Sequence, residues 1–437
     1  MGTIGDDDAC AAGINNNVPT IIGLRCENVE DDLFFVSSIR TQSTSTPPVS
    51  DDTHNEFTWT AFKKVSADYK ENFVMSPYSL RRLFSCFQGV KLLSAGAGTN
   101  LQQELNSVLN IVPNQQPSGQ DHRPYVDQWL RYANAKQLNR TAMAVAIGNE
   151  KASPIFDSII NYCVVYTGYL QPSDGQRMGQ VVNDALKKIT NNSVLNYLAD
   201  TDINPNWKFF AIDSWQFDGL WKYKSQEEFT ATCNFYASKD DKKLTKFLYF
   251  EEVFKYGYFP ELNIQAVELP YHDKSPLSCL LMMSLNGGVD SLVNSMNQSR
   301  FKEVVSKLVP SKTTVRLPQF ELKTTVPGRQ LLESMGMKTP FNQGVFKVFE
   351  QGQDVALGEI VQKMEINMSG DGEIQGQKFP DKQQDKLFTA NQPFMFVIFD
   401  RSEVVPVLVG HYLKAPADAA MGLADVQKCD DPPVGYQ

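Results

Sequence analysis

The chain has 437 residues, 42% of them hydrophobic, which is enough apolar material for one large core or two smaller ones. Its net charge of -9 and pI near 5.2 argue against a protein that binds nucleic acid or an anionic membrane through its overall charge. No stretch approaches the roughly 18 consecutive apolar residues of a transmembrane helix.

Residues 1–55 form a polar N-terminal extension rich in Asp, Asn, Ser and Thr. An apolar island at residues 33–36 either adds a short strand or docks on the body. The first residues, MGTIGDDDACAAGINNN, lack the basic and apolar regions of a signal peptide. The protein is therefore either cytoplasmic or, if a signal peptide was removed before residue 1, extracellular.

Helical spacing of apolar residues predicts the next elements. The segment 76–95 begins with Ser76 as N-cap and Pro77 at the first helical position. The expected helices cover residues 56–69, 76–95, 98–110 and 178–200.

Strand-like runs dominate from Trp207 onward, interrupted by helical segments at 291–309 and 328–337. Because helices come first and strands follow without regular alternation, the pattern predicts an α+β fold. The expected strands cover residues 207–217, 229–237, 244–250, 264–272, 277–285, 313–322, 394–400 and 404–413.

The seven cysteines include no CxxC pair, so no zinc or thioredoxin-like site is expected. Three of them lie in apolar surroundings and are interpreted as buried small hydrophobic residues, namely Cys86, Cys163 and Cys279. One disulfide is hypothesised among the three cysteines of the polar ends, Cys10, Cys26 and Cys429; the alternative is that all seven are free thiols.

No catalytic constellation, metal site or cofactor site is expected, so the protein is not predicted to be an enzyme. The four histidines, His54, His122, His272 and His411, are interpreted as surface or strand-end residues. Acidic pairs such as Glu251 and Glu252 are interpreted as solvated faces or turns. Four sequons raise the possibility of a secreted glycoprotein without deciding it, at Asn139, Asn191, Asn297 and Asn367.

A polar segment of about twenty residues, 366–388, separates two apolar strands near the C-terminus. Loops of that length are usually functional or disordered.

Several motifs, taken together and in order, resemble the serpin family from about residue 56 to Pro416. The segment ENFVMSPYSL is similar to the family's shutter segment, FDGLW to the motif that ends a main-sheet strand, and VELPYH and VRLPQF to two further strand motifs. The segment from Phe388 to Pro416 resembles the C-terminal hairpin almost throughout.

The resemblance implies a serpin fold with a large central mixed sheet, two smaller sheets, about nine helices and a loop before the C-terminal hairpin. It also implies three regions: the extension 1–55, a serpin domain 56–416 and a C-terminal tail 417–437. Inhibitory members present this loop to a protease, and after cleavage the loop enters the main sheet as an extra strand.

Matched to the family, the loop's hinge comprises Gly370, Asp371, Gly372 and Glu373. Burying the Asp371 carboxylate inside a sheet would cost several kcal/mol, and glycines weaken a strand. The expected scissile region includes Lys378, Phe379 and Lys382, the two lysines suiting a trypsin-like protease.

The resemblance further implies a structural shutter at Asn72, Ser76, Ser79 and Asp213, and a structural breach residue at Trp221. Asp213 stands where the family usually has Asn, and its carboxylate is expected to bond the hydroxyl of Ser76 or Ser79. The family's shutter His, expected near Ile360, has no counterpart.

We therefore expect a non-inhibitory serpin, acting as a binding, carrier or structural protein with an unknown protein or small-molecule partner. The alternative is a suicide inhibitor of a trypsin-like serine protease with a degenerate hinge. A protease partner is expected only under that alternative, and neither reading involves nucleic acid or a membrane.

Overall fold

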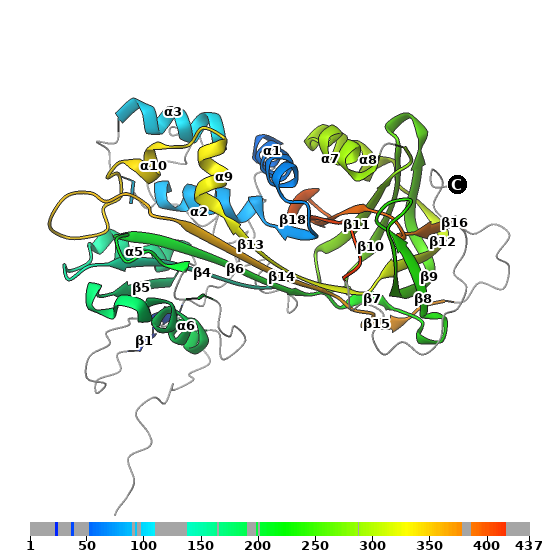
Figure 1. Cartoon of the computed structure of the whole chain (residues 1–437), viewed down its shortest axis with the longest axis horizontal. Coiled ribbons are helices and arrows are strands. Elements are labelled where there is room, and N and C mark those ends of the chain that lie inside the picture. The colour runs from blue at the N-terminus through cyan, green and yellow to red at the C-terminus, as the bar shows by residue number, and fades with distance from the viewer. Residues whose placement is uncertain are drawn as a thin grey trace, which may run out of the picture.

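The computed structural model describes residues 52–89, 92–93, 98–109, 138–163, 166–189, 198–199, 202–286, 288–377 and 386–416, together with the backbone of 22–24 and 36–38. Within these residues it contains nine α-helices, and strands gathered in two large sheets and two small ones (Figure 1). The expected α+β class is confirmed.

The first large sheet is mixed and has five strands in the order β13, β14, β6, β4, β5. The β14–β6 and β4–β5 pairs are parallel, and the other two pairs are antiparallel. The strands are β4 (Leu138–Ile147), β5 (Tyr166–Leu170), β6 (Phe209–Asp218), β13 (Phe320–Pro327) and β14 (Ile360–Met368).

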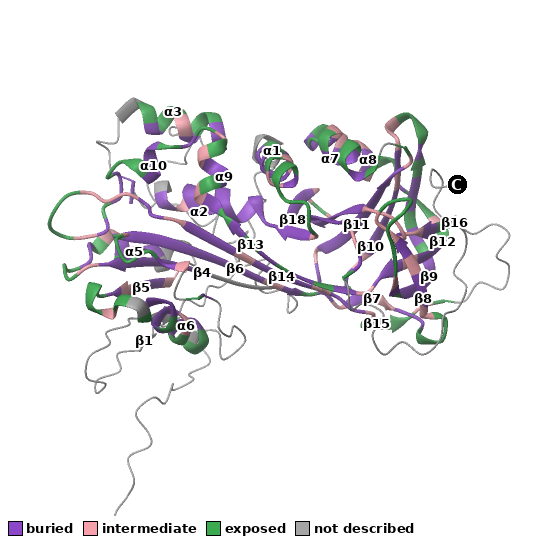
Figure 2. Ribbon diagram, in the orientation of Figure 1, coloured by how far each residue is buried: buried purple, intermediate pink, exposed green. Residues whose placement is uncertain are grey.

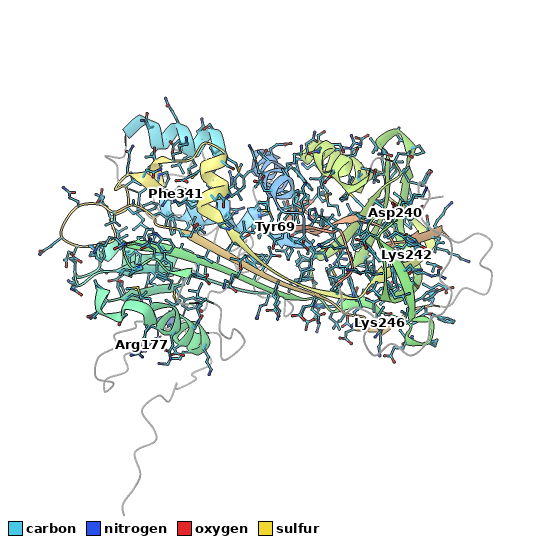
Figure 3. All side chains as sticks on the ribbon, in the orientation of Figure 1. Tyr69, Arg177, Asp240, Lys242, Lys246 and Phe341 are labelled. Carbon is cyan, nitrogen blue, oxygen red and sulfur yellow. The ribbon has the colours of Figure 1, made fainter. Side chains whose placement is uncertain are left out.

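Both faces of this sheet are covered, which explains the nearly continuous apolar run of β6. One face packs on α6 (Met178–Ile189), with Val182 and Leu186 against Phe210. The other packs on α2 (Pro77–Gly89) and α5 (Pro154–Cys163). Figure 3 shows Phe341 on the side of α2 and Arg177 on the side of α6, and Figure 2 shows the buried strands between them.

The second large sheet has nine strands. Its long strand β9 (Lys242–Phe259) pairs with β8 through residues 242–247, with β12 through residues 247–256 and with β10 through residues 255–259. The two smaller sheets expected from the resemblance are thus continuous through β9. The others are β3 (Phe73–Met75), β8 (Ala231–Tyr236), β10 (Ile264–Pro270), β11 (Leu277–Ser284), β12 (Val309–Pro318), β16 (Lys386–Thr389), β17 (Phe394–Asp400) and β18 (Val405–Tyr412).

The remaining helices lie along the same side of the molecule as α2 (Figure 1). They are α1 (Asp52–Asp68), α3 (Gly98–Leu109), α7 (Gly288–Ser295), α8 (Gln298–Lys307), α9 (Gly328–Ser334) and α10 (Thr339–Asn342). Short 3₁₀ helices cover Pro172–Arg177, Glu227–Phe229 and Pro260–Leu262. Among the described residues no helix is long and apolar enough to cross a membrane.

Two small sheets complete the fold: β1 (Ile22–Leu24) with β2 (Val36–Ser38), and β7 (Trp221–Lys224) with β15 (Gly372–Gln375). The N-terminal pair includes the end of the apolar island. The polar segment 366–388 was expected to be a loop throughout. In the structure β14 continues to Met368, β15 lies within the segment, and β16 begins at Lys386.

Cys86 takes part in a disulfide, and so does Cys233; Cys279 is a free, buried thiol. The interpretation of Cys279 as a buried small residue is confirmed, and that of Cys86 is wrong. The hypothesised tail disulfide concerns Cys10, Cys26 and Cys429, which lie outside the described residues, as does the side chain of Cys163.

Candidate functional site: a loop held at both ends

The segment after β14 is fixed by strand pairing at both of its ends. On the near side β15 pairs in parallel with β7, with Gly372 opposite Trp221 and Gln375 opposite Lys224. On the far side β16 pairs in parallel with β12, with Lys386 opposite Thr313. Residues 378–385, which include Lys378, Phe379 and Lys382, join these two ends and lie outside the described residues.

We call residues 369–377, which comprise the turn after β14, β15 and the two residues that follow it, the stem. Three hydrogen bonds hold its turn. The Trp221 N–H donates to the carbonyl of Asp371 at 3.0 Å, and its indole N–H donates to that of Ser369 at 2.8 Å. The Ser225 N–H donates to the carbonyl of Gly370 at 2.9 Å. The stem therefore leaves the five-stranded sheet and follows β7.

The expected hinge residues occupy this stem. A Cβ added at Gly372 would lie 2.3 Å from the backbone nitrogen of Lys224, and one at Gly370 would lie 2.9 Å from the Ser225 side chain. Gly372 is thus required by the close approach of two backbones, and Gly370 by the close approach of the Ser225 side chain. Gly372 allows β15 to lie on β7. From the sequence alone, this glycine was interpreted only as a residue that weakens a strand.

Asp371 and Glu373 are exposed in this state. The Ser369 hydroxyl donates to the Asp371 carboxylate at 3.0 Å, and the Asp273 N–H donates to Glu373 at 3.4 Å. The desolvation expected for Asp371 therefore does not arise while the stem lies on β7.

Two buried side chains hold Gln377, the last described residue before the gap. The Gln226 amide Nε2 donates to the Gln377 carbonyl at 3.0 Å, and the Gln377 N–H donates to the Glu252 carboxylate at 3.3 Å. Gln226 is 0% exposed and Glu252 is 3% exposed. The interpretation of Glu251 and Glu252 as solvated residues is wrong, because both are buried within β9, where their pairing with β12 places them under the loop.

Breach residue Trp221 is buried and stacks on Tyr271, with ring centroids 4.5 Å apart and planes inclined by 10°. The stack fixes the indole so that its N–H reaches the stem. Trp221 therefore belongs to the support of the loop.

Two of the shutter residues, Ser76 and Asp213, are joined by Gln362, a residue that the sequence motifs did not single out. The Gln362 amide Nε2 donates to the Asp213 carboxylate and to the Ser76 carbonyl, both at 2.9 Å, and its Oε1 accepts the Ser76 N–H at 2.9 Å. Gln362 lies two positions after Ile360 and supplies the polar contact sought from a histidine there. A search for any buried polar residue in β14 would have found it.

The contacts of Asp213 and Ser76 differ from the expectation. Asp213 accepts hydrogen bonds from Gln362 and from the indole N–H of Trp215, at 3.3 Å. The Ser76 hydroxyl donates to the Val407 carbonyl at 2.8 Å and accepts the Ser79 N–H at 3.2 Å, capping α2.

Asn72 joins the two ends of the domain. Its Oδ1 accepts the N–H groups of Leu413 and Lys414, at 2.6 and 3.0 Å, and its amide donates to the Lys414 carbonyl at 2.7 Å. The chain after β18 is thereby fixed next to β3.

Comparisons with known proteins agree with this geometry. The serpin (serine protease inhibitor) family model matches residues 52–415. The chain belongs to the serpin family. Among solved structures, this serpin resembles SRPN18 from Anopheles gambiae, with a TM-score of 0.71, 20% identity and coverage of 84% of this chain and 98% of the other. Mouse protein-Z dependent protease inhibitor gives a TM-score of 0.71, 16% identity and coverage of 84% and 97%. The expected serpin fold is confirmed.

Two relatives are similar over nearly the whole serpin. An "FXa-directed anticoagulant" of Aedes albopictus is 38% identical over 397 residues, covering 90% of this chain and 95% of the relative. A protein of the same name from Aedes aegypti is 37% identical over 387 residues, covering 88% and 93%.

These relatives overturn the expectation of a non-inhibitory carrier or structural serpin. That expectation rested on the cost of burying Asp371 and on weak strand formers in the stem. Both features concern entry of the stem into the sheet, and neither concerns which protease the loop binds. The expectation of a protease partner only under the alternative falls with it.

Proposed function

We propose that this serpin inhibits a trypsin-like serine protease, with FXa as the first enzyme to test. The observation that carries the proposal is the similarity, over most of both chains, to two relatives named as FXa-directed anticoagulants. The strand-paired ends of the loop are consistent with it, because β15 and β16 fix the chain on both sides of the segment to which the lysines belong.

Within residues 378–385 we propose Lys382 as the residue that enters the protease's specificity pocket. A trypsin-like enzyme binds a basic side chain there through a buried carboxylate. Lys378 directly follows Gln377, which Gln226 and Glu252 hold, whereas Lys382 is about equally far along the chain from Gln377 and Lys386. Phe379 lacks the charge and precedes a proline.

We propose Gly370, Asp371, Gly372 and Glu373 as the hinge of this inhibitor. After attack on the loop, the stem would leave β7 and enter the sheet between β14 and β6, as the family resemblance implies. The β14–β6 pair would have to open beside Asn367 and Asp218, whose side chains are joined at 3.1 Å.

The test is inhibition of FXa, trypsin, chymotrypsin and elastase by the full chain, with analysis for an SDS-stable complex. We expect inhibition of FXa and trypsin, a large loss in Lys382→Ala, and retention in Lys382→Arg. Lys378→Ala serves as the matched control and should inhibit like the unmodified chain. Failure to inhibit any of these enzymes would overturn the proposal, and a loss confined to Lys378→Ala would move the protease-facing residue.

We further propose that the protein is extracellular. Disulfide-bonded Cys86 and Cys233 support this location, because structural disulfides persist in oxidising compartments. Among the sequons we propose Asn297 as a glycosylation site. Its side chain is exposed, and its Oδ1 accepts the Arg300 N–H at the start of α8, which leaves Nδ2 for a glycan. Secretion of the expressed chain and a mass shift lost in Asn297→Gln would test both points.

A further inference from the structure

Gln226 lies directly after the hydrogen-bonded Ser225 and close to β7, and it is fully buried. Its Nε2 bonds the Gln377 carbonyl, but within the described part of the chain its Oε1 has no partner. A buried polar atom without a partner is a cost to stability. Such a residue is expected to have a role other than stabilising the fold.

Glu252 contacts the backbone of the same residue, Gln377. Its buried carboxylate accepts the Gln377 N–H on one oxygen and the Val253 N–H on the other, at 3.3 and 2.8 Å. A hydrogen bond to a carboxylate is stronger than one between neutral groups. Two side chains from separate parts of the chain thus hold the amide and the carbonyl of one residue.

Gln377 lies at a position in the chain that matters for binding a protease. Gln377 immediately precedes the segment 378–385 to which we assign the contact with the protease. At Gly376 an added Cβ would lie 3.3 Å from the Glu251 carbonyl, so the chain there also runs close to β9. A segment whose near end is fixed needs less ordering when a partner binds it.

We infer that Gln226 and Glu252 are positioning residues for the inhibitory loop, forming a clamp on Gln377 that sets where the protease-binding segment begins. The inference rests on the proposed function. The clamp acts in the state in which the stem lies on β7, and it has to open before the stem can enter the sheet between β14 and β6.

The test compares Gln226→Leu and Glu252→Gln with the unmodified chain. Gln226→Leu removes the donor together with its unpartnered oxygen, and Glu252→Gln removes the charge while keeping the shape. The matched control is Glu227→Gln, because Glu227 is exposed and its ion-pair partner is Lys224, outside the stem. We expect each clamp variant to inhibit FXa or trypsin about fivefold to tenfold more weakly, with a melting temperature no lower than that of the unmodified chain, and the control to inhibit normally.

A second measurement separates the clamp from the proposed function. Hydrogen exchange, followed by mass spectrometry on peptides covering 370–377, should be faster in both clamp variants and unchanged in Glu227→Gln. Unchanged exchange and inhibition in both clamp variants would overturn the inference. If the unmodified chain inhibits no protease, the proposed function fails, yet faster exchange in the variants would still establish the clamp.

Discussion

Gln362 and Asp213 join β14 to β6 through a 2.9 Å hydrogen bond between two side chains that are both 0% exposed. The Gln362 side chain also accepts the N–H of Ser76, just before α2, and donates to the Ser76 carbonyl. One glutamine therefore ties together the two central strands of the five-stranded sheet and the helix that covers them.

Replacing Gln362 by Ala should be strongly destabilising. The change leaves the Ser76 N–H without its acceptor and removes one donor from a buried carboxylate, so we expect a loss of about 2–4 kcal/mol in the free energy of unfolding. Urea denaturation measures it. The control is Gln216→Ala on β6, whose long 3.5 Å contact with Glu365 is half-buried, and which should cost under about 1 kcal/mol. Equal losses in the two variants would contradict this role.

Acidification should destabilise the protein through His411. Burial lowers the pKa of His411 to about 4, while in the unfolded chain it titrates near its ordinary value of 6.5. Between these two pH values the unfolded chain binds more protons, so the free energy of unfolding decreases as pH falls through this window, by up to about 3 kcal/mol.

Denaturant unfolding at several pH values between 7 and 4 would measure this effect. In His411→Gln the neutral side chain can still donate to the Glu71 carbonyl, which His411 contacts at 2.9 Å. This variant should lose that part of the pH dependence and keep the part due to other groups. A slope identical to that of the unmodified chain would show that His411 is not its source.

The cysteines should react in a fixed order. Burial raises the pKa of the Cys279 thiol well above its ordinary range, so iodoacetamide should not modify it in the folded protein. Denaturation without reductant should expose Cys279 to alkylation, whereas Cys86 and Cys233 should require reduction first. Peptide mass spectrometry reads out all three sites, and labelling of Cys86 or Cys233 without reductant would refute the assignment.

A methyl group at residue 372 should detach β15 from β7. In Gly372→Ala the Cβ would meet the backbone of Lys224 at 2.3 Å, which no rotamer change relieves, so we expect a cost of about 1–3 kcal/mol and loss of local pairing. Circular dichroism and susceptibility of the stem to a nonspecific protease would detect this. Glu373→Ala, which changes an exposed side chain on the same strand, should behave like the unmodified chain, and equal resistance in both would argue against the close approach.

Much of the architecture followed from local patterns. The apolar runs at 394–400 and 404–413 predicted β17 and β18, and the Ser76–Pro77 start predicted α2, because burial and capping leave a signal within a few residues. The family motifs then supplied the large central mixed sheet and the loop before the C-terminal hairpin. The polar clusters at the sites left no such signal.

What escaped prediction depends on residues that are distant in sequence. Glu252 looked solvated because it stands beside another glutamate, and only the pairing of β9 with β12 buries it under Gln377. Gln362 was overlooked because a histidine was sought, although an amide of similar reach satisfies the same groups. The loop's composition gave the cost of burying Asp371 the greater weight, and its two lysines entered only the alternative, a trypsin-like protease.

The strand pairs β15–β7 and β16–β12 are made by residues outside 378–385, so the sequence of this segment can change without altering them. Adding, removing or exchanging residues there removes no hydrogen bond of β15 or β16, whereas a one-residue change inside β9 would shift its register against both β10 and β12. Targets could therefore diverge among related chains through this segment alone, on an unaltered scaffold, and a designer could graft a new recognition sequence at the same two junctions.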